Sequence, residues 1–467
     1  MSIEASILSQ TVTETLLPVV PRNTSSTGTD IFVKLKNYIV LWTGTGNPLT
    51  LLKKTANGYK TIKVLPKAGY TVPQVIGNND AFVTKDDVNC SITITFIDPN
   101  TDEVTRTSIV VSTATPGPSN YYQVDTCNGT IFVAAQEGAS SFLYVGTVNF
   151  TNKTVSFIKK TIQSTAVTSG VNSLFAFMML SDTVFAHGAN ANGAGVKGIY
   201  TISAGVVTKT NGAITSVNTY CGGSVIYAII HTNSSAFYYG NNTAWFRQLK
   251  TTQATDGSAS HITPLTTNAP VANQGAMLID NITGVSFVNM YSAEGYCYSV
   301  QGDTCDALAP VGLLTQNNGT STAVGACKLG GFTDGIAFIL DPFNNSFYYG
   351  TAVTYSGGTL MKKPKRIKLY TNNTAKTQFI TSVSIASHAH VSNPMYTAQP
   401  EYFQKNVIGI SINDKILFMD TFSWTTLRTF ANCPIALKPN EYISLEVLNA
   451  FGDITTTING IVDTTQA

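Results

Sequence analysis

Two histidines separated by one residue are the most suggestive chemical feature of the sequence. They stand in His388-Ala389-His390, and the whole chain has 5 histidines. Residues i and i+2 of a β-strand point to the same face, so both imidazoles could converge on one metal ion. Three copies around a three-fold axis would then supply six nitrogen ligands. The alternative is a pair of polar histidines on a surface strand, and the sequence leaves both interpretations open.

A basic run, Lys362 to Lys368, is the only concentrated positive charge in the chain. It could contact phosphate groups on nucleic acid or on a bacterial surface polymer. Pro364 within the run indicates an edge strand. Lysines on an exposed edge also prevent aggregation. We favour this edge-strand interpretation.

Other motifs of catalysis are weak. Oxygen-bearing residues alternate over Asp98 to Asp102 as at the start of a calcium loop, but the later glycine and glutamate are missing, which favours a hairpin turn. The sequence has no nucleophile elbow, phosphate-binding loop, dinucleotide fingerprint or zinc-protease motif. We therefore predict that the protein is not an enzyme. A carboxylate pair for glycoside hydrolysis assembles only in the fold, so the sequence does not decide that point.

The cysteines do not form a metal or redox motif. There are 7 of them, an odd number, and no two are separated by two residues. Cys297 and Cys305 flank a predicted hairpin turn, so a disulfide between them is geometrically possible. The first residues, Met1 to Arg22, lack the basic start of a secretion signal. We therefore expect synthesis in a cytoplasm and favour reduced thiols.

The elements that would position these residues form an internal repeat of β-runs. Each unit has an apolar strand, a second strand, a tight turn and a third strand, and units recur about every 50 residues. The turn Asn57-Gly58 in the first unit is a strong hairpin signal, because both positions tolerate positive φ. The units cover residues 38–65, 80–111, 130–158, 183–210, 224–249, 285–313 and 335–369.

Further apolar runs precede several units and could form a fourth, innermost strand: 31–35, 121–124, 174–180 and 276–279. Four-stranded units at this spacing are typical of β-propeller blades. We therefore predict an all-β protein with a seven-bladed β-propeller over residues 30–375. A stack of β-sandwiches is the alternative.

The two ends of the chain break the repeat. Residues 376–467 contain β-runs with a different spacing, and they predict a small C-terminal antiparallel β-sandwich. Residues 1–29 are rich in Ser and Thr and carry one short apolar segment, Leu16–Val20. They predict an extended N-terminal docking arm.

Composition excludes several classes of protein. Only 12% of the residues are charged, 43% are hydrophobic, and the formal net charge is +2. This balance excludes intrinsic disorder and coiled coils. The near-zero charge gives no case for nucleic acid or an anionic membrane as a partner, and no apolar run is long enough for a membrane helix.

This low-charge, Thr- and Asn-rich, all-β composition resembles bacteriophage virion proteins, especially tail fibre, baseplate and adsorption components. The spacing of His388 and His390 is similar to the His-x-His iron sites of phage spike and fibre trimers. The resemblance implies a structural protein of the virion, made in the host cytoplasm and bound to other virion proteins. It also implies a homo-oligomer, with a trimer as one form, and a host-surface glycan as one partner. It implies no cofactor beyond a metal ion at a symmetry axis.

Two other functions stay open, a glycan-degrading propeller enzyme (a depolymerase) and a propeller that serves as an interaction scaffold. The enzyme predicts carboxylates that line a cleft at the propeller axis or at a subunit interface. The structural protein predicts an axis filled by small or apolar side chains and large contacts between copies. The scaffold predicts a monomer with one exposed patch.

Overall fold

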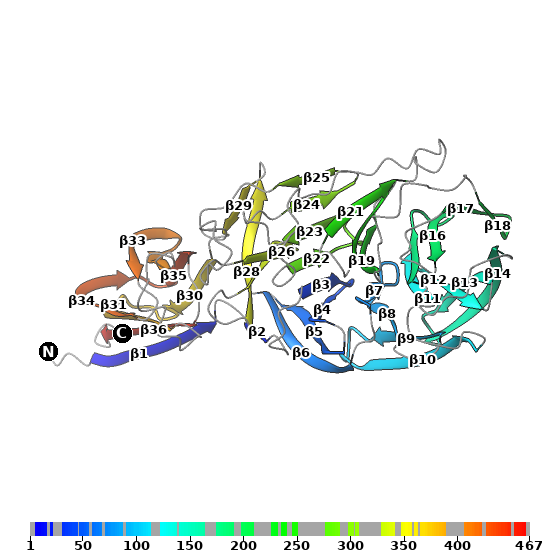
Figure 1. Ribbon diagram of the computed structural model, residues 1–467. Helices are drawn as coiled ribbons and strands as arrows, with labels where there is room; N and C mark the ends of the chain where they lie inside the picture. Colours follow the sequence, from blue (N-terminus) through cyan, green and yellow to red (C-terminus); the bar gives the residue numbers. More distant parts are fainter. Residues whose placement is uncertain are drawn as a thin grey trace.

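The computed structural model consists of β-strands joined by turns and short connections (Figure 1). No helix that could cross a membrane occurs in the part of the chain that the structure describes. That part comprises residues 5–15, 19–21, 30–44, 46–55, 58–67, 71–86, 90–113, 122–137, 140–163, 174–190, 198–209, 226–231, 235–240, 245–250, 276–289, 298–302, 304–307, 328–340, 347–356, 359–362, 365–388, 406–422, 426–449 and 453–463.

Seven antiparallel blades form a β-propeller, and the chain builds them in order around the ring (Figure 1). The first four blades are β3 (Asp30–Lys34), β4 (Tyr38–Trp42), β5 (Pro48–Thr55) and β6 (Gly58–Lys67); β7 (Gln74–Val75), β8 (Ala81–Lys85), β9 (Cys90–Ile97) and β10 (Val104–Ser112); β11 (Tyr122–Cys127), β12 (Thr130–Glu137), β13 (Ser140–Asn149) and β14 (Thr154–Gln163); and β15 (Leu174–Met179), β16 (Val184–Asn190), β17 (Gly198–Ser203) and β18 (Val206–Lys209). The last three are β19 (Ile226–His231), β20 (Ser235–Gly240) and β21 (Trp245–Lys250); β22 (Ala276–Ile279), β23 (Val285–Asn289), β24 (Tyr298–Gln301) and β25 (Thr304–Ala307); and β26 (Lys328–Thr333), β27 (Ile336–Leu340), β28 (Phe347–Ser356) and β29 (Thr359–Lys362).

The predicted repeat is confirmed as seven blades, with local differences. The unit predicted over 224–249 supplies β19, β20 and β21, so its first run is the innermost strand rather than the second. The last strand of the sixth unit, predicted near 307–313, is β25 and begins at Thr304. Its register pairs Gln301 with Thr304 across a tight turn, which starts the strand earlier than the apolar run suggests.

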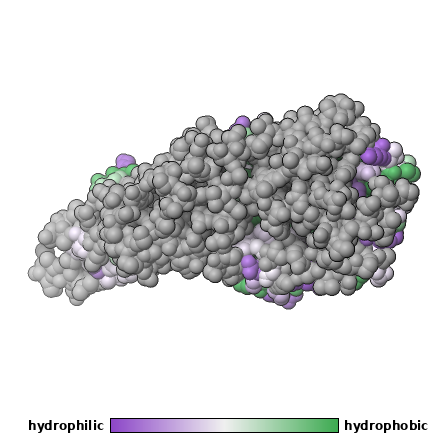
Figure 2. Space-filling view, viewed as in Figure 1, coloured by the Kyte–Doolittle hydropathy of each residue, from purple (hydrophilic) through white to green (hydrophobic). Residues whose placement is uncertain are grey.

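Burial follows position in the blade. The inner strands β3 and β4 are buried at every residue, whereas most residues of the outer strand β10 are partly buried or exposed. Outer strands also expose aliphatic side chains, with Ile158 62% exposed and Val206 63% exposed. Hydrophobic residues are visible at the propeller rim in Figure 2. The sequence therefore alternates least where strands pack on both faces.

Three contacts close the ring where the first, sixth and seventh blades meet. The innermost strands β22 and β3 pair in parallel, from Ala276 opposite Asp30 to Ile279 opposite Val33. The ring of Phe338 in β27 lies 4.6 Å from that of Phe32 in β3, centroid to centroid. Strand β2 (Val19–Pro21), from the N-terminal end of the chain, pairs with β28 of the same blade.

One glycine makes the close packing of the seventh blade possible. Gly331 in β26 has φ of +147°, and a Cβ atom there would lie 2.5 Å from Cβ of Leu278 in β22. Any side chain would therefore push the sixth and seventh blades apart.

The remaining strands form a two-sheet sandwich at the other end of the molecule (Figure 1). One sheet has the order β1-β36-β31-β34 and the other β30-β35-β32-β33. Their bounds are β1 (Ala5–Thr15), β30 (Lys365–Thr371), β31 (Gln378–His388), β32 (Asn406–Ile412), β33 (Lys415–Phe422), β34 (Thr426–Leu437), β35 (Tyr442–Asn449) and β36 (Asp453–Asp463). A single aliphatic core, which includes Ile380, Ile410 and Leu445, lies between the sheets.

The sandwich corrects the predicted limits of the domains. The predicted arm 1–29 contains β1, which pairs with β36 over eleven registered positions, from Ala5 opposite Asp463 to Thr15 opposite Asp453. The arm is extended as predicted, but these residues complete the chain's own C-terminal sheet. The predicted boundary at 375 also falls too late, because β30 already belongs to the sandwich.

Candidate functional site

Polar side chains gather where the innermost strand of each blade ends and turns back into the blade. We call the residues at these strand ends and in the turns that follow them the inner-turn ring. Asp and Asn suit such turns because their side chains can bond to nearby backbone amides. Within the described residues, these turns carry Asn37, Asp80, Asn128, Asp182, Asp280 and Asp334.

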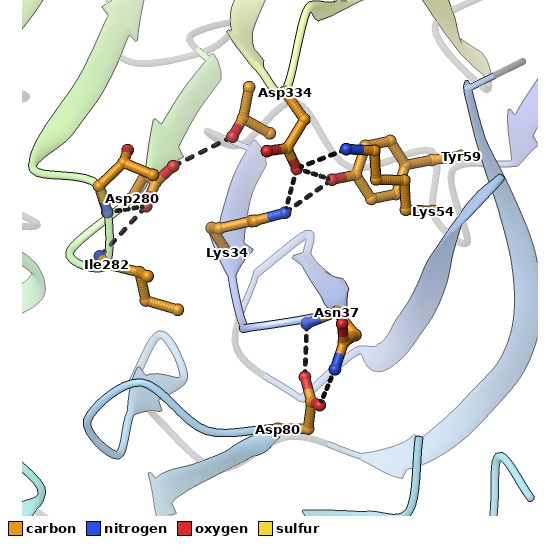
Figure 3. Close-up of polar contacts among 10 residues, drawn as sticks. Lys34, Asn37, Lys54, Tyr59, Asp80, Asp280, Ile282 and Asp334 are labelled. Atoms are coloured by element: carbon orange, nitrogen blue, oxygen red, sulfur yellow. Dashed lines mark hydrogen bonds and ion pairs between the residues drawn. The ribbon is translucent and has the colours of Figure 1, made fainter. Parts of the chain in front are cut away.

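Asp334 joins the seventh blade to the first. Its carboxylate accepts hydrogen bonds from Nζ of Lys34 at 2.5 Å and from the Tyr59 hydroxyl at 2.9 Å (Figure 3). Nζ of Lys54 lies 3.6 Å from the same oxygen. Nζ of Lys34 also donates to the Tyr59 hydroxyl at 2.8 Å. Three side chains of the first blade thus converge on one carboxylate of the seventh.

The pKa shifts of Asp334 and Tyr59 in this cluster have opposite directions. Burial opposes ionisation of Asp334, but the adjacent Lys34 ammonium and the Tyr59 hydroxyl outweigh it and lower the pKa of the carboxyl group. Burial, together with the Asp334 charge, raises the pKa of Tyr59 far above its usual value. The carboxylate is therefore ionised and the phenol protonated, which suits a fixed contact rather than proton transfer.

Asp80 and Asp280 make equivalent contacts elsewhere in the ring (Figure 3). Both carboxylate oxygens of Asp80 accept from Asn37 in the first blade, one from the backbone N–H and one from the side-chain amide, each at 2.6 Å. Asp280 accepts from two backbone amides of its own turn and, at 3.0 Å, from the Thr333 hydroxyl of the seventh blade. Each carboxylate therefore fixes a turn and ties it to the next blade.

Asp125, inside the innermost strand β11 and close to the inner-turn ring, is a fully buried carboxylate that joins three blades. It is 0% exposed and accepts from the backbone N–H groups of Thr126 and Met179 at 2.8 and 2.7 Å. Its Oδ1 lies 2.9 Å from Nε2 of His231 in the fifth blade. The backbone N–H of His231 in turn donates to Asn281 of the sixth blade at 3.0 Å. Burial lowers the pKa of His231, but the Asp125 charge outweighs it and the pKa is raised.

Together these contacts form a closed circuit around the propeller. The remaining link joins the second and third blades, where the Thr126 hydroxyl donates to the Val75 carbonyl at 2.7 Å. Every blade therefore shares at least one polar contact of the inner-turn ring with another blade. Carboxylates that accept hydrogen bonds from a neighbouring blade link the two blades.

The sequence did not lead us to this ring, although it holds a signal. An Asp or Asn follows each described innermost strand that ends in a described turn, from Asn37 to Asp334. Taken singly, each of these residues indicates only a turn. Their recurrence at the blade period is the feature that would have identified them.

A second buried lysine lies between the second and third blades. Lys85 is 1% exposed, and its Nζ donates to the Tyr122 carbonyl at 2.5 Å and lies 4.5 Å from the centroid of the Tyr122 ring. Burial lowers the pKa of Lys85 to about 7, and the neighbouring Cys90 only partly offsets it. This cation has no carboxylate partner among its hydrogen bonds and ion pairs in the described residues.

The predicted metal ligands are only partly within the described residues. His388 is the last residue of β31 and lies opposite Asp453 of β36 in the sheet register. His390 lies outside the described residues. Within the described ranges, no group of three or more His, Cys, Asp or Glu side chains is arranged to hold a metal ion. Metal binding by the His388 and His390 pair stays a prediction.

The basic run divides between two strands. Lys362 ends β29, and the run continues in β30, which is an edge strand of its sheet as predicted. Arg366 forms ion pairs with Glu446 and Asp414, and Nζ of Lys368 lies 4.1 Å from the centroid of the Tyr442 ring. These side chains therefore stabilise the sandwich.

The remaining candidates have structural roles. Asp98 to Asp102 form the predicted hairpin turn, in which Asp102 accepts from the Tyr38 hydroxyl at 2.6 Å and from Lys53 at 2.7 Å. Cys305 carries a free thiol and pairs in register with Val300, while Cys297 lies outside the described residues.

Comparisons with known proteins give similarity of fold and nothing further. No protein-family model matches the chain, and no curated protein sequence does either. Among solved structures, similarity is found to a "putative 6-phosphogluconolactonase" from Bacteroides fragilis, with 9% identity, a TM-score of 0.41, and coverage of 74% of this chain and 93% of that one. The WD40 domain of Toxoplasma gondii coronin gives 14% identity, a TM-score of 0.38, and coverage of 74% and 85%. These values carry no argument about activity.

Proposed function

We propose that the protein is a structural component of a virus particle of the bacteriophage tail type, in tail fibre, baseplate or adsorption apparatus. In this role the propeller is a stiff ring and the C-terminal sandwich makes contacts with other copies or other virion proteins. The low-charge, all-β composition supports this setting. The inner-turn ring supports the mechanical part of the role, because its carboxylates tie the blades together.

Apolar packing between the blades is the observation that carries the proposal. Innermost strands from four blades contribute to one buried apolar cluster: Ile31 and Val33 from β3, Val75 from β7, Ile230 from β19, and Met277 and Ile279 from β22. Apolar packing that four blades share supports a rigid structural body, which is the role proposed here. Protein interiors built from well-packed apolar side chains resist deformation.

The buried carboxylates near the inner turns give less support to the enzyme alternative. Glycoside hydrolysis needs two carboxyl groups that face a shared space where the sugar lies. Asp80, Asp125, Asp280 and Asp334 each accept at least two hydrogen bonds from the protein, as described above. A carboxylate held in this way is committed to its turn and its neighbouring blade.

The proposal is tested first by the mass of the purified protein in solution, measured by light scattering with and without a chelator. We expect a stable homo-oligomer, and dissociation on chelation would identify His388 and His390 as ligands. A protein that stays monomeric at all concentrations would contradict the assembly role.

Immunogold labelling of particles released by the source culture is the second test. We expect antibodies against the chain to label particles. A protein that is abundant in the soluble fraction but absent from particles would contradict the virion setting, whatever its mass.

A further inference from the structure

One sheet of the C-terminal sandwich has an outer face of small, uncharged polar side chains. Alternation along its strands separates this face from the buried one. The buried face packs into the sandwich core through aliphatic side chains that are at most 2% exposed: Ile380, Val383, Ile385 and Ile458. The opposite face, which we call the hydroxyl face, is formed by Ser9, Thr11, Ser382, Ser384, Thr429, Thr457 and Asn459, all exposed or partly exposed.

The longer row of the hydroxyl face crosses all four strands. Thr11, Thr457, Ser384 and Thr429 are neighbours in register on β1, β36, β31 and β34. The Thr11 and Thr457 hydroxyls lie 3.0 Å apart, and the Ser384 and Thr429 hydroxyls 3.1 Å apart. Each hydroxyl has one donor and two acceptor positions, so one shared hydrogen bond per pair leaves most of this capacity free.

A second row lies beside the first and adds an amide. The Ser9 hydroxyl donates to the side-chain oxygen of Asn459 at 3.1 Å, and the Asn459 amide donates to the Ser382 hydroxyl at 3.4 Å. These residues also follow the register of β1, β36 and β31. No member of the two rows is charged, so the face offers hydrogen bonds without a net field.

A bulge places an aromatic ring at the end of the hydroxyl face. Between Ile380 and Ser382 the register shifts, and Thr381 is the extra residue. The shift puts Phe379 and Ser382 on the same face although they are three positions apart. Phe379 is 42% exposed, and it lies opposite Ile461 of β36 and Ala436 of β34, at the next position on this face beyond the second row. Its exposure serves no core contact of the sandwich.

From this arrangement we propose that the hydroxyl face binds a neutral polysaccharide. Sugar hydroxyls match rows of side-chain hydroxyls and amides, either directly or through bridging water. A pyranose ring also presents a face of C–H bonds that can stack on an exposed aromatic ring such as Phe379. The proposal rests on the hydroxyl face and Phe379 alone and does not depend on the virion setting.

A second copy of the chain fits this surface less well. The centres of protein interfaces are rich in aromatic residues, Met and Arg, and poor in Ser. The hydroxyl face has the opposite composition. Cross-strand pairing of Thr and Ser stabilises a sheet and explains the hydrogen bonds in the rows. It does not explain why Phe379 is left exposed beside them.

Affinity electrophoresis of the full-length protein tests the proposal, with dextran, galactomannan or arabinoxylan in the gel and polygalacturonate as an anionic control. We expect retardation by at least one neutral polymer. Phe379→Ala and Thr429→Lys should each weaken the binding by about tenfold, which corresponds to the loss of about one good contact. Thr208→Lys places the same change on an exposed propeller strand, β18, and should leave the binding unchanged.

Three results would overturn the proposal. They are the absence of retardation in all three neutral gels, retardation that both face variants retain, and retardation that Thr208→Lys abolishes equally. A fourth would replace it: if Thr429→Lys splits an oligomer in light scattering and leaves retardation unchanged, a second copy covers the face. Circular dichroism of each variant shows that the fold is kept, and the exposed positions of Thr429 and Phe379 make this outcome expected.

Discussion

Two lysines are buried between blades of the same propeller, and their surroundings differ. Lys34 is 4% exposed and meets the Asp334 carboxylate and the Tyr59 hydroxyl. Lys85 is 1% exposed and meets a backbone carbonyl and the ring of Tyr122. The first is a paired cation in a fixed contact, and the second is an amine that burial makes easier to deprotonate.

The difference shows that burial alone does not determine what a lysine contributes to a fold. A buried ammonium with a carboxylate partner costs much when that partner is lost. A buried amine without one is itself a cost at low pH, because its charged form is poorly solvated. The same residue type therefore stabilises one blade interface and weakens another.

The largest effect is expected for Asp334→Asn. Asn tolerates the positive φ of 54° at this position, so the change removes the charge and keeps the turn. Lys34 would stay buried beside a neutral amide, which should lower the free energy of unfolding by about 2–4 kcal/mol in denaturant titrations. Asp182→Asn, in an exposed turn of the fourth blade, is the matched control and should change it by less than about 0.5 kcal/mol. Equal losses in both variants would refute the assignment.

Lys85→Met should have the opposite sign. We expect it to raise the free energy of unfolding by about 2 kcal/mol at pH 7, because an apolar side chain of similar length replaces a poorly solvated cation. The pKa of Lys85 is about 7 in the folded protein and 10.5 as the reference value, so the unfolded chain holds the extra proton between these limits. Stability of the wild type should therefore rise with pH from about 7 to 10.5, and the variant should lose this rise. A variant that keeps the full rise would show that other groups cause it.

His231→Gln should have a smaller effect that depends on pH. The pKa of His231 is raised from 6.5, so the stability from its contact with Asp125 is fully present below 6.5 and is lost as pH rises through the folded value. We expect the variant to lose about 1–2 kcal/mol at pH 6 and less at higher pH. A pH-independent loss in denaturant titrations would indicate that the neutral hydrogen bond alone matters.

The smallest effect is expected for the double variant Lys34→Met with Asp334→Asn. Removing both charges avoids an unpaired buried cation, so the free energy of unfolding should stay within about 1 kcal/mol of the wild type. If the double variant is as unstable as Asp334→Asn alone, the contacts of Asp334 with Tyr59 and Lys54 dominate the interface.

The repeat could be predicted from the sequence because blades are local. Turn-forming residues such as Asn57-Gly58 indicate each hairpin, and the two strands of a hairpin are close in the chain. Strand β34 escaped prediction, because Pro434 and a register jump between Ala431 and Ile435 interrupt its alternation. The pairing of β1 with β36 was not predicted either, because the sequence of a single strand does not identify the strand with which it pairs.

The inner-turn ring and the hydroxyl face could not be predicted for a related reason. The contact of Asp125 with His231 joins positions 106 apart, and that of Lys34 with Asp334 joins positions 300 apart. Residues so far apart in the chain come into contact only when the ring of blades is complete. The row from Thr11 to Thr429 likewise needs the register of four strands, which local composition does not fix.

The pairing of the first strand with the last also delays completion of the sandwich until late in synthesis of the chain. A ribosome that adds about 5–20 residues per second would need roughly 20–90 s between finishing β1 and starting β36. During that interval the propeller strands can fold, while β1 has no partner within its sheet. A prematurely terminated chain could never close the sandwich and would leave β1 as an open edge. Only a chain synthesised through β36 can therefore present the finished surface of the sandwich.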